Sequence, residues 1–161
     1  MPKDFKVTLT GDAELRRKLQ NPEFVRGPVR QFLTKSAILL EQEVKDETPA
    51  DTGRLRAAIT HKVEPFRAIV GVKANSGASS YASHVEFGTK PHWPPLAALQ
   101  PWAVRHGFPP GRAGAFLVAR AIARRGTRAR RMFQKGVTAS RGRIMRMWQD
   151  VGGQVEARWK R

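Results

Sequence analysis

The sequence predicts an α+β fold: an antiparallel β-sheet of three to four strands packed against one long α-helix, with a helical, basic C-terminal part. Apolar residues recur at helical spacing between Val29 and Val44, short segments of alternating apolar and polar residues flank that stretch, and six prolines punctuate the second half. The 161 residues, 40% of them hydrophobic, suffice for one domain. We expect a core domain over 1–90. A basic, proline-punctuated extension over 91–161 either joins that domain or forms an arm.

The first expected elements are a strand and a short helix. Apolar and polar residues alternate over Phe5–Leu9, which is typical of a half-buried strand, and the strand should end at Gly11. Asp12 is placed to cap a short helix that carries Leu15 and Leu19 on one side.

The long helix is expected to begin at the Gly27-Pro28 break, because proline suits the first helical position. It should end near Thr48, since Pro49 disfavours helical geometry in the residue before it. One apolar stripe runs along it and consists of Val29, Leu33, Ala37, Leu40 and Val44.

Three strand-like segments follow the long helix. Alternation predicts strands at Ile59–Val63, Ile69–Val72 and Tyr81–Phe87, with a turn at Pro65-Phe66 between the first two. The stretch Ala74–Ser80 has no packing residues and is expected to be a flexible connection. Short connections of this kind favour antiparallel pairing.

The second half is expected to be helical. A short helix is predicted from Pro95 to Arg105, and another around Phe116–Ala123, stopped by Gly126. A last helix carries apolar residues at helical spacing over Ile144–Trp159. Gly152-Gly153 should interrupt it, at about 1 kcal/mol per glycine.

Charge is the most unusual feature of the composition. The formal net charge is +17, and residues 1–100 contain 15 Lys+Arg and 11 Asp+Glu, whereas residues 101–161 contain 15 and 2. Such asymmetry indicates a polyanionic partner or an acidic protein surface. No cysteine is present, which excludes disulfides and thiolate metal sites. The apolar runs are far shorter than the about 20 residues that span a bilayer, and no apolar signal region opens the chain. We therefore expect no membrane association and a cytoplasmic place of assembly.

Catalytic and cofactor motifs are not visible in the sequence. No phosphate-binding loop, dinucleotide fingerprint or nucleophile elbow occurs. His84 and Glu86 would share one face of the expected third strand, where a polar surface is a better interpretation than a metal site. We expect no enzyme, no metal and no cofactor. A toxin-like or nuclease enzyme would need metal-dependent turnover that changes at His84 or Glu86 abolish.

Two charged clusters are the candidate interaction surfaces. If the arginine tract is one helix, one continuous face for phosphates or carboxylates is formed by Arg120, Arg124, Arg128 and Arg131. Arg125 belongs to the same candidate interaction surface. Nothing in the sequence is organised to read bases, so any DNA contact should be independent of sequence. Glu41, Glu43, Asp46 and Glu47 crowd the last two turns of the long helix, where carboxylates oppose the helix dipole. Lys45 should offset part of this effect by pairing with Glu41 at i,i+4. We expect the arginine face of one protomer to dock there on its neighbour.

Two short motifs carry a family resemblance. The first, TPADTGRLRAAI over residues 48–59, contains Asp51, Gly53, Arg54 and Leu55. The second, YASHVEFGT over residues 81–89, contains Tyr81, Glu86, Phe87 and Gly88. Their residue types predict structural roles: Asp51 caps a turn, the glycines permit tight backbone, Phe87 anchors a strand end, and Glu86 pairs with Arg54 or Arg56.

In this order and spacing the motifs resemble the phage tail-completion or head–tail joining proteins, the gene-product-ten family of HK-type siphophages. The segments HWPPLAALQPW, AFLVARAIARRGTRAR and MFQKG look like the same family, so the resemblance extends from Pro28 to about Ser140.

The resemblance implies a non-enzymatic virion protein of a tailed phage. Such a protein would act at the neck, where the tail meets the head, and would form a homo-oligomeric ring with other neck and tail proteins around the DNA path. It would be assembled in the cytoplasm of the bacterial host. The alternative is an accessory protein that binds nucleic acid without sequence preference.

Overall fold

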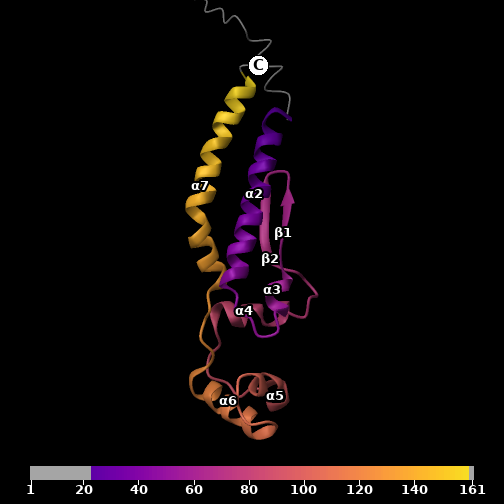
Figure 1. The fold of residues 1–161 in the computed structure, drawn as a ribbon, viewed down its shortest axis with the longest axis vertical. Helices are drawn as coiled ribbons and strands as arrows, with labels where there is room; N and C mark the ends of the chain where they lie inside the picture. The colour runs from indigo at the N-terminus through magenta and orange to yellow at the C-terminus, as the bar shows by residue number, and fades with distance from the viewer. Residues whose placement is uncertain (1–22, 160–161) are drawn as a thin grey trace, which may run out of the picture.

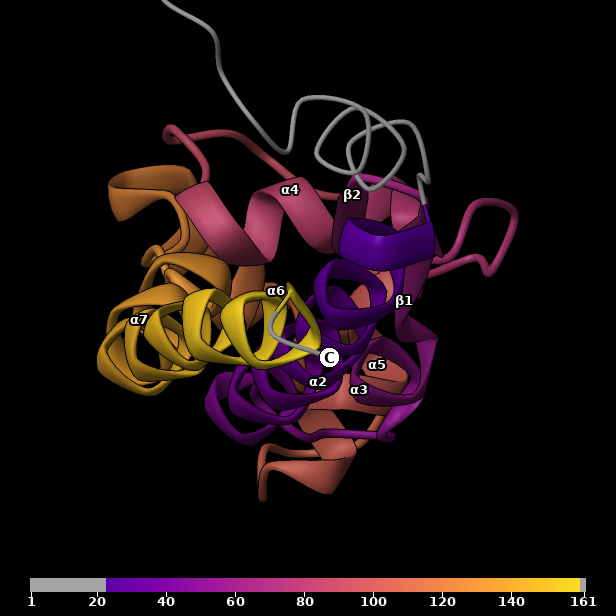
Figure 2. The same cartoon turned by 90° about the horizontal axis from the view of Figure 1, so that it is seen from above.

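The computed structural model describes residues 23–159 and shows an elongated molecule built mostly of helices. The elements are, in order, α2 (Glu23–Glu47), α3 (Arg54–Ala58), β1 (Ile59–Glu64), β2 (Arg67–Val72), α4 (Ser79–Phe87), α5 (Leu96–Arg105), α6 (Arg112–Arg125) and α7 (Met132–Trp159). The long helices α2 and α7 run antiparallel, and the β1–β2 hairpin lies on the other side of α2 (Figures 1 and 2). The strand expected over 5–9 and the helix expected after Asp12 lie outside the described residues.

Helix α2 confirms the predicted long helix and its end. Ala37 and Val44, from the expected apolar stripe, are buried, and the helix ends at Glu47. The buried Thr48 hydroxyl donates to the Val44 carbonyl at 2.6 Å and closes the last turn. The predicted start at Pro28 is wrong, because the helix begins at Glu23 and runs through the proline. Pro28 lacks the N–H of an i→i−4 bond, yet its ring is fully buried, beside the small cavity that Val151 of α7 also lines.

The described residues contain a two-stranded antiparallel sheet rather than the three to four strands predicted. Strands β1 and β2 pair from Ile59 opposite Val72 to Glu64 opposite Arg67. The more buried residues of β1 alternate with exposed ones, so one face packs against α2. An isolated hairpin is marginal in water, and this one depends on that packing.

The predicted third strand over Tyr81–Phe87 is wrong, because this segment forms helix α4. The buried positions are Ala78, Ala82 and Glu86, which recur every four residues as one helical face. Tyr81 and Val85 also stand four apart and pack against the core. The alternation that suggested a strand came from side chains on different sides of this helix.

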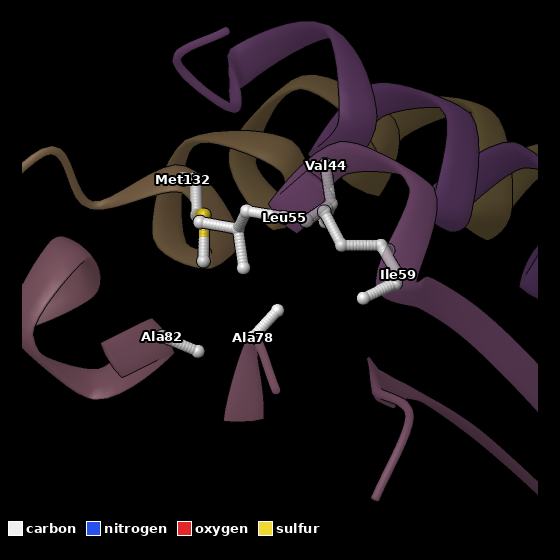
Figure 3. Packing of buried hydrophobic residues seen from close by; sticks show 7 residues of the cluster. Val44, Leu55, Ile59, Ala78, Ala82 and Met132 are labelled. Carbon is white, nitrogen blue, oxygen red and sulfur yellow. The ribbon is translucent and has the colours of Figure 1, made fainter. Parts of the chain in front are cut away.

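The hydrophobic core lies where the end of α2 meets α3, α4 and the first turn of α7. Figure 3 shows these side chains converging from segments far apart in sequence; the buried cluster consists of Val44, Leu55, Ala58, Ile59, Ala78, Ala82 and Met132. Ile59, Val44 and Met132 are the largest apolar side chains that are fully buried. The core is small, so each of these residues holds several elements at once.

Helix α7 packs along α2 and belongs to the same body. Gly136 lies so close to Val44 that an added Cβ would be 2.6 Å from the Val44 Cγ2 atom and 2.9 Å from its backbone nitrogen. Further along, Phe32 and Trp148 pack edge to face with ring centroids 5.1 Å apart. The expected interruption at Gly152-Gly153 is wrong, since α7 continues to Trp159. The division expected at residue 90 would group α7 with α5 and α6, whereas α7 packs on α2.

Helices α5 and α6 confirm the two predicted helices and pack against each other. They lie at the far end of the molecule, beyond α3 and α4 (Figure 1), and we call them the α5–α6 lobe. Gly126 ends α6 with a φ of 70°, as expected for a helix stop. The Trp102 ring stacks on the His106 ring, with centroids 3.9 Å apart.

Candidate functional site

The first motif joins the body to the α5–α6 lobe. Asp51 was expected to cap the next turn, but the residue at the N-cap of α3 is Gly53, with a φ of 74°. The Asp51 carboxylate instead accepts two hydrogen bonds from the Arg105 guanidinium of α5, at 2.8 and 2.5 Å. Arg105 lowers the pKa of the Asp51 carboxyl through these hydrogen bonds and through its charge. Leu55 is buried in the core, as a structural role requires, and Arg54 is exposed.

The second motif joins α4 to α7 through Glu86. This residue was expected to pair with Arg54 or Arg56, but its buried carboxylate accepts from the backbone N–H groups of Phe133 and Gln134, at 3.0 and 3.3 Å. These N–H groups are in the first turn of α7, where a helix has no partners of its own. A carboxylate there also interacts favourably with the helix dipole. Glu86 is therefore the cap of α7, while Arg56 donates to the Thr48 carbonyl.

The other residues of the second motif have contrasting environments. Tyr81 is half-buried against the core. Phe87 was expected to anchor a strand end, but it lies at the end of α4 with 79% of its surface exposed, so this expectation is wrong. Gly88 has a φ of 73°, and a Cβ there would be 2.4 Å from the Thr127 carbonyl oxygen. Only glycine fits such a close approach with this backbone conformation.

Gly88 belongs to a crossing of two chain segments that connects the lobe to the body. Thr89 and Thr127 form an antiparallel bridge with backbone bonds of 3.1 and 3.2 Å, and their hydroxyls are 3.0 Å apart. A Cβ on Gly126 would be 1.9 Å from the Thr89 carbonyl oxygen. One segment leaves α4 and the other leads to α7, so the lobe leaves and rejoins the body at one point, the Thr89–Thr127 crossing.

The acidic end of α2 has partners within its own chain. Glu43 pairs with Arg143, and Glu47 pairs with Lys135 at 3.2 Å, both cations belonging to α7. Asp46 accepts from the Gln42 side-chain amide at 3.0 Å. The premise that the arginine tract is the cation source for these carboxylates is therefore wrong, because α7 supplies the cations. Docking of the tract on this helix end in a neighbour remains untested.

The arginine tract does not form one continuous helical face. Arg120, Arg124 and Arg125 are on α6, but the helix ends there, and Arg128 lies in the non-helical segment that leads to α7. Arg131 has a φ of 54°, and its N–H donates to the Glu86 carbonyl at 3.1 Å. All five side chains are exposed. Gly126 causes the break, because its conformation turns the chain into the Thr89–Thr127 crossing.

Glu41 forms a further polar cluster between α2 and the hairpin. Its carboxylate pairs with Lys45 on the same helix and with His61 of β1. Burial opposes the lowering of its pKa, but hydrogen bonds from Lys45 and His61 prevail and the pKa is lowered. Lys45 was expected to pair with Glu41, and this is confirmed.

Several residues that join the elements were not identified from the sequence. Nothing in the sequence distinguishes these residues from other polar residues, and no local pattern gives their partners. They are Arg105, Thr127, Lys135 and Arg143. Gly126 was identified as a helix stop but not as part of a crossing. His84 and Glu86 stand on a helix, where residues two apart do not share a face.

Residues 23–159 present neither a cluster of metal ligands nor a membrane-spanning helix. No group of three or more His, Cys, Asp or Glu side chains there is arranged to hold a metal ion. No helix in the same range has the length and apolar character to cross a membrane.

The described part of the chain is thus a mixed α/β protein, mostly helical with one antiparallel hairpin, whose motif residues join elements to each other. Residues 14–88 match the family described as "Bacteriophage HK97-gp10, putative tail-component", which confirms the resemblance drawn from the two motifs and indicates a phage tail component. The match ends at Gly88, so the resemblance of the later segments remains a prediction. No curated protein and no solved structure matches the chain.

Proposed function

We propose that this protein is a structural virion component that completes the tail and joins it to the head, acting as a homo-oligomeric ring with other neck and tail proteins. The family match to a tail component supports a structural, non-enzymatic role in the virion. Assembly would take place in the cytoplasm of the bacterial host. The observation that supports an oligomer is the exposed apolar surface on the two long helices, α2 and α7.

Large apolar side chains remain half-exposed on both α2 and α7. Val25 and Ile38 of α2 are 45% and 54% exposed, and Val137 and Met145 of α7 are 49% and 52% exposed. Exposed apolar side chains that form a contiguous patch are typical of contact sites with other proteins, and we expect these residues to lie in such a contact. A heterologous contact between such surfaces closes into a ring when its rotation permits.

The hairpin offers a second surface for assembly. Within the described residues, β1 and β2 pair only with each other, so each has an edge that no described strand occupies. A free strand edge is a template for pairing with another chain. Ile69 on the solvent face of β2 is 44% exposed and would be covered by such a neighbour.

Native mass spectrometry and negative-stain electron microscopy of the purified protein test this proposal. We expect one closed oligomer, seen as a ring, at micromolar concentration alone or with tail components. Val137→Lys combined with Met145→Lys should shift it to monomer, whereas Thr138→Lys with Gln134→Lys, equal in added charge on exposed polar positions of α7, should not. A parent protein that is monomeric in every mixture would contradict the proposal.

A further inference from the structure

The outer face of α6 combines unpaired cations with large apolar side chains. Leu117, Arg120 and Arg124 are spaced three and four residues apart, so they share one side of the helix. Leu117 is 47% exposed, and both arginines are exposed. Phe116, at the edge of this side, packs edge to face on Trp93 with centroids 5.6 Å apart, although the two rings are 46% and 53% exposed. We call these five residues the α6 face.

The arginines of the α6 face differ from three cations that join elements to each other. Arg105, Lys135 and Arg143 each have a carboxylate partner. Arg120 and Arg124 form no ion pair with any residue in the range 23–159. Two cations four residues apart on one helix repel each other, so α6 carries a local destabilisation that an external anion would remove.

A second copy of this chain is a poor source for that anion. Seven carboxylates of the body are already engaged by cations, amides or helix N–H groups within the chain: Glu41, Glu43, Asp46, Glu47, Asp51, Glu64 and Glu86. A copy would have to break one of these contacts to form a new one. A different molecule is therefore the better source of the anion.

We propose that the α6 face docks on an acidic, apolar-lined surface of a different protein. Contact with DNA phosphates would satisfy the arginines but leave Leu117, Phe116 and Trp93 in water. A protein surface with carboxylates around an apolar depression would satisfy both kinds of side chain. Arginine and aromatic residues side by side are also the composition of protein interface centres.

This inference goes beyond the ring proposed above, because it concerns α6 and a different partner. Synthetic polymers separate the two chemistries: poly-glutamate offers carboxylates alone, and a copolymer of glutamate and tyrosine offers carboxylates with apolar rings. A duplex DNA of arbitrary sequence offers phosphates. Binding of the full chain to each is measured by fluorescence anisotropy at about 0.15 M ionic strength, where distant charges are screened.

The full chain should bind the glutamate–tyrosine copolymer about tenfold or more tightly than poly-glutamate, equivalent to about 1.4 kcal/mol. Arg120→Glu with Arg124→Glu should weaken binding to both polymers by a similar factor. Leu117→Ser should reduce the preference for the copolymer and leave poly-glutamate binding unchanged. The matched control is Arg141→Glu with Arg146→Glu, which changes the net charge equally on exposed positions of α7 and should have little effect.

Three results would overturn the proposal. If the α7 control loses as much binding as the α6 variant, net charge alone explains the binding. If duplex DNA binds more tightly than the copolymer and Leu117→Ser has no effect, the α6 face binds phosphates instead. If the α6 arginine variant changes the mass of the oligomer in native mass spectrometry, the partner is a second copy. Thermal melts by circular dichroism confirm that each variant is folded.

Discussion

Each of the two sequence motifs contains a carboxylate that forms hydrogen bonds with a segment much later in the chain. Asp51 bonds to Arg105, 54 positions away, and Glu86 bonds to the N–H groups of Phe133 and Gln134, 47 and 48 positions away. Asp51 is exposed and its partner is a charged side chain, whereas Glu86 is buried and its partners are backbone groups. The two positions should therefore respond differently to mutation.

Glu86→Ala should lower the free energy of unfolding by about 1–3 kcal/mol, because it leaves N–H groups of α7 without an acceptor. Glu86→Gln keeps an acceptor but loses the charge at the helix N-terminus, so the loss should be about 0.3–1 kcal/mol. Urea denaturation followed by circular dichroism measures both. Glu47→Gln, which breaks the exposed pair with Lys135, serves as control and should change stability by about 1 kcal/mol or less. Equal effects of Glu86→Ala and Glu47→Gln would contradict the capping role.

The Asp51–Arg105 contact between lobe and body should be lost at low pH. The pKa of Asp51 is lowered from an ordinary value of 3.8. A lowered pKa in the folded state means that the contact contributes fully above pH 3.8 and is lost as the pH falls through the folded pKa. NMR titration of the Asp51 carboxyl should show this lowered pKa, and Arg105→Gln should return it toward its ordinary value. A pKa that does not move in Arg105→Gln would show that the contact does not form in solution.

Neither partner could be predicted from the sequence, for a physical reason. A helix cap or an i,i+4 pair is local, so Gly126 and the Lys45–Glu41 pair were correctly predicted. Asp51 and Glu86 are the kinds of residue that cap nearby turns, and only the tertiary arrangement offers them more distant partners. The same holds for Glu43 and Glu47, whose cations come from α7.

Between elements, the most extensive contact is that of α7 with α2. Gly136 faces the backbone of Val44, so the two helices approach each other more closely than side chains would allow. Val44 is fully buried, as are Met132 and Ser140, which lie on either side of Gly136 along α7. The position of α7 is therefore set near its N-terminal end, beside the cap that Glu86 provides.

Gly136→Ala and Gly142→Ala should have opposite effects on stability. An exposed glycine within a helix is less stable than alanine by about 1 kcal/mol, so Gly142→Ala should be stabilising by up to that amount, as its Cβ meets nothing closer than 3.8 Å. At Gly136 the Cβ would push against the Val44 backbone, and such overpacking costs about 1–3 kcal/mol. Urea denaturation of both variants measures the difference. A stabilising Gly136→Ala would show that α7 lies further from α2 than described.

The sequence predicted those elements whose apolar residues fit either helical spacing or strand alternation, but not both. Helices α2, α5 and α6 and strands β1 and β2 were predicted, with α2 beginning earlier than expected, and of α7 only the part from Ile144 onward was predicted. Helix α4 was missed because Tyr81, Val85 and Phe87 fit alternation as well as a helix, and because its buried face includes the small Ala78 and Ala82 and the charged Glu86. Short helices that bury small residues give a weak hydrophobic signal.

The whole molecule consists of a body and a lobe, and the buried cluster around Val44 belongs to the body alone. No residue of the buried cluster comes from the stretch between Thr89 and Thr127. On the body side of the crossing, the N–H groups of Arg130 and Arg131 donate to the carbonyls of Val85 and Glu86, so α4 already lies beside the start of α7. The family match also ends at Gly88, next to the crossing from which the chain leads to the lobe.

Replacing residues 90–126 by two glycines should therefore leave the body folded. Among the described residues, the replacement removes mainly one interaction between lobe and body, the exposed Asp51–Arg105 ion pair. Because exposed ion pairs are weak, the free energy of unfolding should change by about 1 kcal/mol or less. Hydrogen exchange should still show protected amides in α2 and α7. Unprotected amides in these two helices would mean that the lobe is needed for the fold of the body.

The Thr89–Thr127 crossing also has a consequence for the order in which the chain folds. These residues are 38 positions apart, and bringing together the ends of a flexible segment of that length costs about 3 kcal/mol in chain entropy. When α5 and α6 are already packed, the segment is no longer flexible, and much of that entropy has been lost before Met132 reaches the core. The α5–α6 pair is local in sequence, so it can form early, as local contacts generally do. Early formation of the lobe would thus accelerate the docking of α7, although the lobe contributes no residue to the buried cluster in which α7 docks.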